Sequence, residues 1–267
     1  MDVIYAVLLG ILQGITEWLP ISSSGHLAIA QNFFRLEVPV MFDIVLHFGT
    51  ALAAVVFLKE EILEIVFGWF NAIKTKNFSN RGVKLSIMVF TALIPTALIG
   101  FAFKDFFESM FFEIKYVGVA LIITAILLFL AEKTKEIKGK KPSYFDALVM
   151  GVFQGFAVAP GISRSGSTLA GGMILGNDRI EVARFSFLIS LPAILGAGIF
   201  EGLEGASLGF IQQNLLSVFS GFFASAIVGY LSMKFLVESI ARGKLWWFGV
   251  YCFFVGIGIS LKEFYFL

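Results

Sequence analysis

Two apolar regions of this chain, residues 1–34 and 143–176, are each interrupted by a similar Gly/Pro/Ser-rich break. The first break lies in QGITEWLPISSSGH at 13–26 and the second in QGFAVAPGISRSGS at 154–167, at an offset of 141 residues. Each piece is shorter than the ~20 apolar residues that a helix needs to cross a bilayer. We therefore expect two re-entrant helical hairpins, because irregular backbone is tolerated at membrane depth only inside protein or along a cavity.

The composition points to a membrane protein. Hydrophobic residues make up 58% of the chain, charged residues 15%, and the mean hydropathy is +0.89, whereas a soluble domain is roughly half apolar and about a quarter charged. The net charge of +1 provides no basic field that would indicate nucleic acid as a partner. The single cysteine, Cys252, excludes an internal disulfide and a cysteine-based metal cluster.

Six other segments are apolar and long enough, or nearly so, to span a bilayer: 41–58, 84–104, 115–132, 182–201, 212–236 and 244–262. Segment 59–83 is expected to be an amphipathic surface helix followed by a loop. Each half of the chain then holds one hairpin and three spans, so the second half must start on the opposite side of the membrane. We predict an all-α polytopic membrane protein, a single membrane domain (1–267) with six transmembrane helices and two re-entrant hairpins in an inverted repeat of 1–132 and 143–267.

The distribution of basic residues predicts the orientation in a plasma membrane. With this topology, fifteen Lys and Arg fall on the side opposite the first hairpin and four on its own side, while Arg164 lies inside the second break. Because cytoplasmic loops carry an excess of Lys and Arg, both termini are predicted to be extracytoplasmic. A site between the hairpins would open to the extracytoplasmic side.

Three ionisable residues, Glu17, His26 and Arg164, fall at the breaks. A charge at the bilayer centre costs about 3 kcal/mol on insertion scales, so such residues usually have a function. A structural Glu17–Arg164 ion pair that pins the two halves together is the alternative. Seven hydroxyls around the breaks favour an oxyanion site over that alternative: Ser22, Ser23, Ser24, Ser163, Ser165, Ser167 and Thr168.

The two breaks offer complementary chemistry. In PGISRSGST at 160–168, backbone amides and the arginine fork would form an anion cradle. In the first break, Glu17 is a base or metal ligand, Ser23 a hydroxyl nucleophile and His26 a proton donor. Gln13 lies one helical turn before Glu17 and would orient a water or a metal ligand, or simply pack. His47 is predicted to be a packing histidine, with Asp43 one turn earlier as its partner.

The stretches QGITEWLPISSSGHL and PGISRSGST, together with FDIVLHFGT and the chain length, resemble the undecaprenyl-pyrophosphate phosphatase family of bacitracin-resistance membrane phosphatases. The resemblance implies hydrolysis of undecaprenyl diphosphate to the monophosphate and inorganic phosphate, which recycles the lipid carrier for cell-wall glycans. It also implies six spanning helices, two re-entrant hairpins and a divalent cation, Mg or Ca.

When the family's motifs are transferred position by position, the resemblance places its acidic motif on Gln13 and Glu17. Because residue 13 is a glutamine and not a carboxylate, it weakens the case for a metal site made of two carboxylates. The resemblance places the family's serine and histidine on Ser23 and His26. The predicted catalytic residues are Glu17, Ser23, His26 and Arg164, and Glu17 is also the predicted metal ligand. The predicted substrate-binding residues are Gln13, Ser22, Ser24, Ser163, Ser165 and Thr168. Whether Ser23 or a water attacks phosphorus stays open at this point.

Two further questions stay open from the sequence. The competing function is a polyprenyl-phosphate flippase, because inverted repeats that meet at broken helices are also transporter architecture. Small-residue patterns such as Gly196 to Gly198 and Gly249 to Gly258 would pack helices within one chain or in a homodimer.

Overall fold

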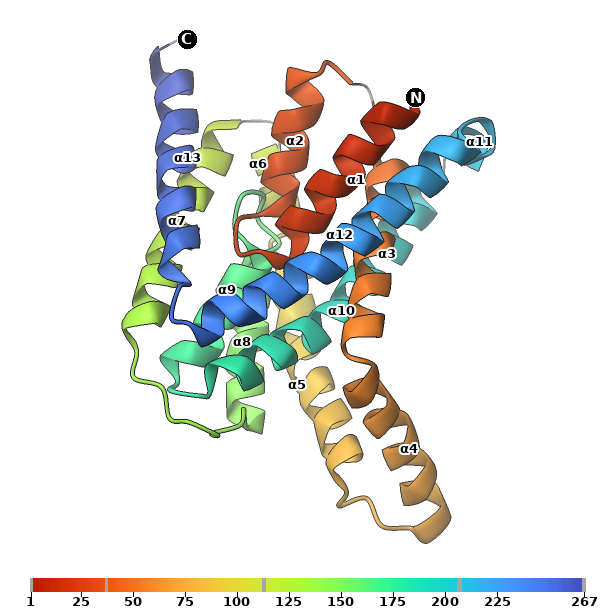
Figure 1. The fold of residues 1–267 in the computed structure, drawn as a ribbon, viewed down its shortest axis with the longest axis vertical. Helices are drawn as coiled ribbons and strands as arrows, with labels where there is room; N and C mark the ends of the chain where they lie inside the picture. The colour runs from red at the N-terminus through yellow and green to blue at the C-terminus, as the bar shows by residue number, and fades with distance from the viewer. Residues whose placement is uncertain (1, 37, 112–113, 206–207, 266–267) are drawn as a thin grey trace.

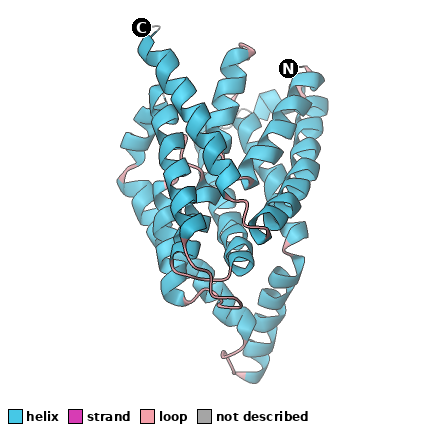
Figure 2. Cartoon of the chain, turned by 60° about the vertical axis from the view of Figure 1, so that its left-hand side comes forward, coloured by secondary structure: helices cyan, strands magenta, loops and turns pink. Residues whose placement is uncertain are grey.

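The computed structural model describes residues 2–36, 38–111, 114–205 and 208–265. Within these ranges every regular element is a helix (Figure 2). The thirteen helices in the described ranges run in the order labelled in Figure 1: α1 (Val3–Trp18), α2 (Ser23–Phe33), α3 (Val40–Phe57), α4 (Lys59–Thr75), α5 (Arg81–Ala102), α6 (Lys104–Phe111), α7 (Ile114–Lys133), α8 (Tyr144–Phe156), α9 (Arg164–Ile174), α10 (Arg179–Gly205), α11 (Leu208–Gln213), α12 (Leu215–Ala241) and α13 (Trp246–Tyr265).

Five of the described helices, α3, α5, α7, α10 and α12, are long and apolar enough to cross a bilayer. They coincide with five of the six predicted spans, to within a few residues at each end. The sixth predicted span, 244–262, is helical in α13, but its apolar part at Trp246–Lys262 is shorter. The expected amphipathic helix in 59–83 is α4, which is followed by a loop at 76–80. The fold is thus all-helical and polytopic, and the number of six transmembrane helices stays a prediction.

The two interrupted regions form two pairs of short helices, α1 with α2 and α8 with α9. Helix α1 ends at Trp18 because the next residue, Leu19, precedes Pro20 and adopts an extended conformation (φ −68°, ψ 143°). The second interruption contains Pro160 and Gly161, and the φ of Gly161 is +89°. Pro20 thus ends α1 directly, whereas α8 ends at Phe156 and Pro160 lies in the turn that follows it.

Helices at matching positions of the two halves pack in matching ways. Helix α1 packs on α12, and helix α8 packs on α5. A Cβ added at Gly14 would lie 2.8 Å from the Cβ of Val228, and one added at the matching Gly155 would lie 2.8 Å from the Cβ of Ile99. Small residues let the backbones approach closely in both pairs. This correspondence supports the inverted repeat, which stays a prediction.

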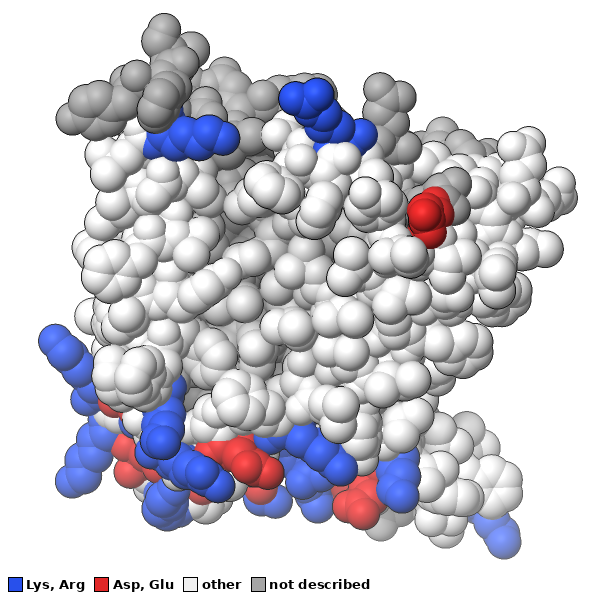
Figure 3. Space-filling model, turned by 45° about the horizontal axis from the view of Figure 1, so that its top comes forward, with Lys and Arg blue, Asp and Glu red and all other residues white. Residues whose placement is uncertain are grey.

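Charged side chains gather at one end of the molecule, away from the two termini, and an uncharged belt separates this end from the other (Figures 1 and 3). Here the linker between the halves is bound to the loop before α10. Gly139 N donates to Asp178 Oδ2 at 2.9 Å, Asp178 N donates to the carbonyl of Lys140 at 2.9 Å, and Arg179 N at the start of α10 donates to Glu136 Oε1 at 3.0 Å. The linker is therefore fixed by specific hydrogen bonds.

Candidate active site

The two breaks lie against each other in the middle of the fold, where the red loop between α1 and α2 lies beside the green loop between α8 and α9 (Figure 1). Ser165 Oγ donates to the carbonyl of Leu19 at 3.1 Å, and a Cβ added at Gly166 would lie 3.2 Å from the Cβ of Pro20. A Cβ on Gly161 would lie 2.8 Å from the backbone of Val117 in α7, so no side chain fits there. Glycine thus allows both the positive φ and the close approach.

Both second helices of the pairs begin at this meeting point with the same type of cap. The side chain of Ser22 accepts from Gly25 N at 3.4 Å, and that of Ser163 accepts from Gly166 N at 3.1 Å. The N-termini of α2 and α9, which carry partial positive charge, therefore both begin at the breaks. Ser22 has a φ of +71°, an uncommon conformation for a residue other than glycine.

The buried carboxylate of Glu17 joins the two breaks. Its Oε1 pairs with Arg164 Nη2 of the second break. Its Oε2 accepts from Ser23 Oγ at 2.6 Å and from Gln13 Nε2 at 3.0 Å, and His47 Nε2 lies 3.5 Å away. Glu17 is 5% exposed. The predicted residues Gln13, Glu17, Ser23 and Arg164 are thus brought together.

The Arg164 guanidinium has one nitrogen engaged by Glu17 and another without a hydrogen-bond partner among the described residues. Its Nη1 is buried and has no hydrogen-bond partner among the described residues. Its Cζ lies 5.7 Å from the centroid of the Trp18 ring, which is itself fully buried. The guanidinium is therefore held between Trp18 and Glu17, with N–H donors left for an anion.

The hydroxyls of the other predicted substrate-binding residues form hydrogen bonds mainly with groups of the protein itself. Ser163 Oγ lies 3.2 Å from Ser165 Oγ, and the amide of Ser163 donates to Thr124 Oγ1 at 3.0 Å. Thr168 Oγ1 donates to the carbonyl of Arg164 at 3.0 Å and lies 2.5 Å from Ser186 Oγ. In the first break, Ser24 Oγ lies 3.4 Å from Ser22 Oγ. These hydroxyls fix the two breaks in shape.

His26 does not hydrogen-bond to Ser23 in this structure. Its Nδ1 lies 2.7 Å from the carbonyl of Ser22, and its Nε2 lies 2.6 Å from the hydroxyl of Tyr251 in α13. Because a carbonyl only accepts, Nδ1 carries the proton, and in the neutral ring Nε2 accepts from the Tyr251 hydroxyl. The two rings also stack, with centroids 5.7 Å apart and planes at 18°.

Two site residues were missed by sequence reasoning. Tyr251 is one of several aromatic residues near span ends, and nothing in its local sequence connects it with His26. His47 was predicted to be a packing residue, but its Nε2 faces Glu17, and its Nδ1 lies 2.8 Å from the backbone carbonyl of Asp43. The carboxylate of Asp43 accepts from Gln31 Nε2 at 2.8 Å. For His47 the sequence did contain one signal, because an ionisable residue inside a membrane span by itself favours a functional role.

The donor atoms around Glu17 are compatible with a divalent cation bound together with a ligand. Among the described residues, no group of three or more His, Cys, Asp or Glu side chains is arranged to hold a metal. Gln13 Oε1 is, however, buried beside Glu17 without a hydrogen-bond partner in the described part of the chain. Mg²⁺ typically takes one or two protein carboxylates and completes its shell with water and substrate phosphates. One carboxylate and one amide oxygen fit that pattern.

Taken together, the fold and the site define a polytopic helical membrane protein in which two broken helices place a carboxylate, a serine and an arginine around one buried point. Residues 6–258 match the family model described as "Bacitracin resistance protein BacA". The chain belongs to the BacA family of multi-pass membrane proteins.

Curated relatives align over nearly the whole chain. The chain is 40% identical over 266 residues to the undecaprenyl-diphosphatase of Halothermothrix orenii, covering 98% of both chains. It is 39% identical to the undecaprenyl-diphosphatase of Carboxydothermus hydrogenoformans, again covering 98% of both. The protein of the same name from Methanococcus maripaludis is 42% identical over 92% of this chain and 94% of its own.

Proposed function

We propose that this protein is a membrane phosphatase that hydrolyses undecaprenyl diphosphate to undecaprenyl phosphate and inorganic phosphate. The names of its relatives support this activity and substrate. The observation that carries the proposal at the level of the site is the buried Glu17 carboxylate, which contacts Ser23 on its own hairpin and Arg164 on the other. The product would re-enter cell-wall glycan synthesis as the lipid carrier.

In this proposal the diphosphate enters between the two breaks while the prenyl chain stays in lipid. Arg164 binds the phosphate oxygens, first through Nη1, which has no hydrogen-bond partner in the described part of the chain, and then through both arms of its planar fork. Binding of the phosphate by Nη2 releases Glu17 from its ion pair. The backbone amides at the start of α2 and α9 add partial positive charge around the head group. Ser22, Ser24, Ser163, Ser165 and Thr168 hold these amides in place.

The freed Glu17 then acts as the base for Ser23. The Ser23 oxygen attacks the terminal phosphorus, its proton passes to Glu17 Oε2 at 2.6 Å, and the bond from phosphorus to the bridging oxygen breaks. Undecaprenyl phosphate leaves, and water hydrolyses the resulting phosphoserine to inorganic phosphate and free Ser23. Phosphoryl transfer depends mostly on positioning and charge neutralisation. A water in place of Ser23 is the alternative nucleophile, and a phosphoserine trapped on Ser23 distinguishes the two.

We assign His26 to proton transfer at the leaving group or at the attacking water. Tyr251 holds the ring in one tautomer through the 2.6 Å hydrogen bond to Nε2, so the phenol must move or relay the proton. His47, 3.5 Å from Glu17, stabilises the carboxylate once Arg164 has turned to the phosphate. Both roles follow from the contacts of the two rings.

We propose that Glu17, with the amide oxygen of Gln13, would hold a divalent cation, Mg or Ca, when substrate is present. When bound, it would neutralise the negative charge that develops on the phosphate oxygens. With or without a bound cation, Gln13 positions Glu17 through the 3.0 Å hydrogen bond that its Nε2 donates to Glu17 Oε2.

The orientation proposed here places the lysine- and arginine-rich end in the cytoplasm and both termini outside. Six transmembrane helices and two re-entrant hairpins in an inverted repeat then give an active site that opens to the extracytoplasmic side of the plasma membrane. The gathering of charged side chains at one end of the molecule supports this choice. This orientation can be tested with a cysteine added after residue 267. Labelling of that cysteine by a membrane-impermeant maleimide in whole cells is the expected result.

Phosphate release by purified protein tests the proposed function. A polyprenyl diphosphate is incubated with wild type and with Glu17→Gln in detergent, and inorganic phosphate is measured. Release by wild type and its loss in a folded Glu17→Gln variant are expected. A flippase would move labelled lipid diphosphate across liposomes without releasing phosphate, and that outcome would replace the phosphatase.

A further inference from the structure

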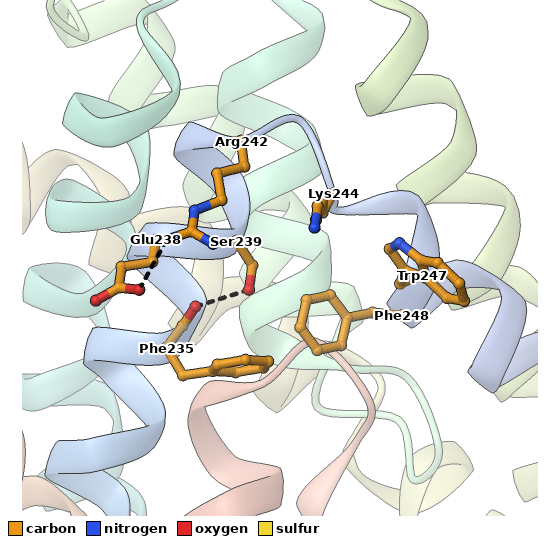
Figure 4. Close-up of a pocket in the computed structure, with 7 residues that line it drawn as sticks. All are labelled: Phe235, Glu238, Ser239, Arg242, Lys244, Trp247 and Phe248. Atoms are coloured by element: carbon orange, nitrogen blue, oxygen red, sulfur yellow. Dashed lines mark hydrogen bonds and ion pairs between the residues drawn. The ribbon is translucent and has the colours of Figure 1, made fainter.

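A pocket lies between the C-terminus of α12 and the start of α13 (Figure 4). This turn lies at the end of the molecule away from the two termini, where charged side chains gather (Figures 1 and 3). The volume of the pocket is about 270 Å³. None of the candidate active-site residues line it. Its lining includes three charged and three aromatic side chains: Glu238, Arg242 and Lys244, and Phe235, Trp247 and Phe248.

The polar side of this pocket carries a net positive charge. Arg242 and Lys244 contribute two positive charges and Glu238 one negative charge. Arg242 Nη2 lies 3.6 Å from Glu238 Oε2, and both side chains are 67% exposed. A loose ion pair in such an exposed place contributes little to stability. The guanidinium therefore keeps donors for an anion, while the carboxylate disfavours a ligand with a second negative charge.

The other side of the pocket is apolar and aromatic. The rings of Phe235 and Phe248 meet edge to face at 6.3 Å and lie below the basic side chains in Figure 4. Trp247 is 57% exposed and stacks on Trp246 at 4.4 Å. Exposed tryptophans and phenylalanines beside lysine and arginine are typical of the boundary between head groups and acyl chains.

An exposed apolar stripe leads from the pocket along α12. Phe223, Ile227, Leu231 and Phe235, spaced four residues apart, are between 53% and 62% exposed. Residues at this spacing share one face of a helix. The stripe is roughly 18 Å long at 1.5 Å per residue, and half of a ~30 Å hydrocarbon core is about 15 Å. Measured along the helix, the stripe is thus long enough for a lipid acyl chain within one leaflet to lie against it.

The turn that carries the basic side chains is fixed before any ligand binds. Lys244 N donates to the carbonyl of Ser239 at 2.9 Å, Gly243 has a φ of +65°, and Leu245 is fully buried. A preformed turn lowers the entropic cost of binding.

We propose that this pocket binds the head group of a monoanionic glycerophospholipid, such as phosphatidylglycerol, from the leaflet at the lysine-rich end. The phosphodiester lies between Arg242 and Lys244, the glycerol over Phe235 and Phe248, and an acyl chain along the stripe on α12. A soluble anion would use the two basic side chains but not the apolar floor or the stripe. The site is separate from the proposed active site and does not depend on the proposed function.

Quenching of tryptophan fluorescence by brominated lipids tests this proposal. Protein carrying Trp69→Phe is reconstituted in phosphatidylcholine, so that Trp246 and Trp247 provide the exposed indoles, since Trp18 is fully buried. Brominated phosphatidylglycerol is then compared with brominated phosphatidylcholine. With one net positive charge in the pocket, we expect an about fivefold preference for the anionic lipid.

The preference should disappear in the double variant Arg242→Gln/Lys244→Gln, whose two sites are exposed and should not affect folding. Lys234→Gln is the matched control. It removes a positive charge from the same helix, where the Lys234 ammonium lies over the Tyr230 ring at 4.6 Å and does not line the pocket. Equal quenching by both lipids in the parent protein, or an equal loss of preference in Lys234→Gln, would overturn the proposal. Tighter binding of phosphatidic acid would overturn the assignment of a monoanion.

Discussion

Replacing Arg164 by lysine separates phosphate binding from the structural ion pair. Lysine keeps the positive charge opposite Glu17, which is 3% exposed at its side chain. Lysine has no planar fork, so it lacks an equivalent of the buried Nη1, which is unpartnered among the residues that the structure describes. The change should thus affect the enzyme when substrate is bound and leave the free protein nearly unchanged.

The size of the effect follows from the hydrogen bond that is lost. A hydrogen bond to a charged group contributes about 1.5–3 kcal/mol. At about 1.4 kcal/mol per factor of ten, its loss predicts a roughly 10- to 150-fold decrease in kcat/KM. Arg164→Gln should behave differently, because it leaves the buried Glu17 carboxylate without its partner. Removing one member of a buried ion pair lowers stability by about 3–5 kcal/mol.

The assay measures phosphate release from a long-chain prenyl diphosphate and thermal unfolding of the same detergent preparations. We expect Arg164→Lys to unfold close to wild type with a strongly reduced kcat/KM, and Arg164→Gln to lose both stability and activity. A wild-type kcat/KM in Arg164→Lys would refute the reasoning, since the guanidinium would then be only a structural partner of Glu17.

Two further predictions concern the candidate active site and one concerns the linker between the halves. Ser23→Ala should lower kcat at least about 100-fold, and phosphoserine at position 23, found by mass spectrometry of quenched wild-type reactions, should be absent from the variant. Tyr251→Phe removes one hydrogen bond to His26 and should lower kcat about 2- to 10-fold with a changed pH–rate profile, whereas a merely structural role would leave the profile unmoved. Burial raises the pKa of Asp178, but hydrogen bonds from the amides of Gly139 and two α10 residues outweigh it and hold the pKa below its ordinary value of 3.8. Because the folded pKa is depressed, the stability from Asp178 is complete above pH 3.8 and is lost as the pH falls further. The difference in melting temperature between wild type and Asp178→Asn should therefore be present at pH 7 and shrink below pH 3.8.

The repeated breaks were the most informative part of the sequence for the site. They predicted that QGITEWLPISSSGH and QGFAVAPGISRSGS would interrupt their helices, because both are rich in Gly, Pro and Ser. They also predicted that Glu17, Ser23 and Arg164 would share one site, because two breaks that enter the membrane must be buried against each other. The structure places these three residues in contact.

Contacts between distant helices could not be predicted in the same way. Tyr251 reaches His26 from a helix 225 residues further along the chain, and no local pattern specifies which of many aromatic residues does so. His47 has the spacing of a packing residue on α3, and its partner Glu17 becomes apparent only when α3 is packed on α1. Sequence periodicity identifies helices, whereas the contacts between them depend on how their surfaces fit.

Metal-dependent phosphate release tests the central claim most directly. Purified wild type, Glu17→Ala and Arg164→Ala are compared on a long-chain polyprenyl diphosphate with Mg²⁺, with Ca²⁺ and with chelator. We expect release by wild type that requires the cation and is lost in both variants when they remain folded. Undiminished release by a folded Glu17→Ala or Arg164→Ala variant would contradict an active site between the two breaks.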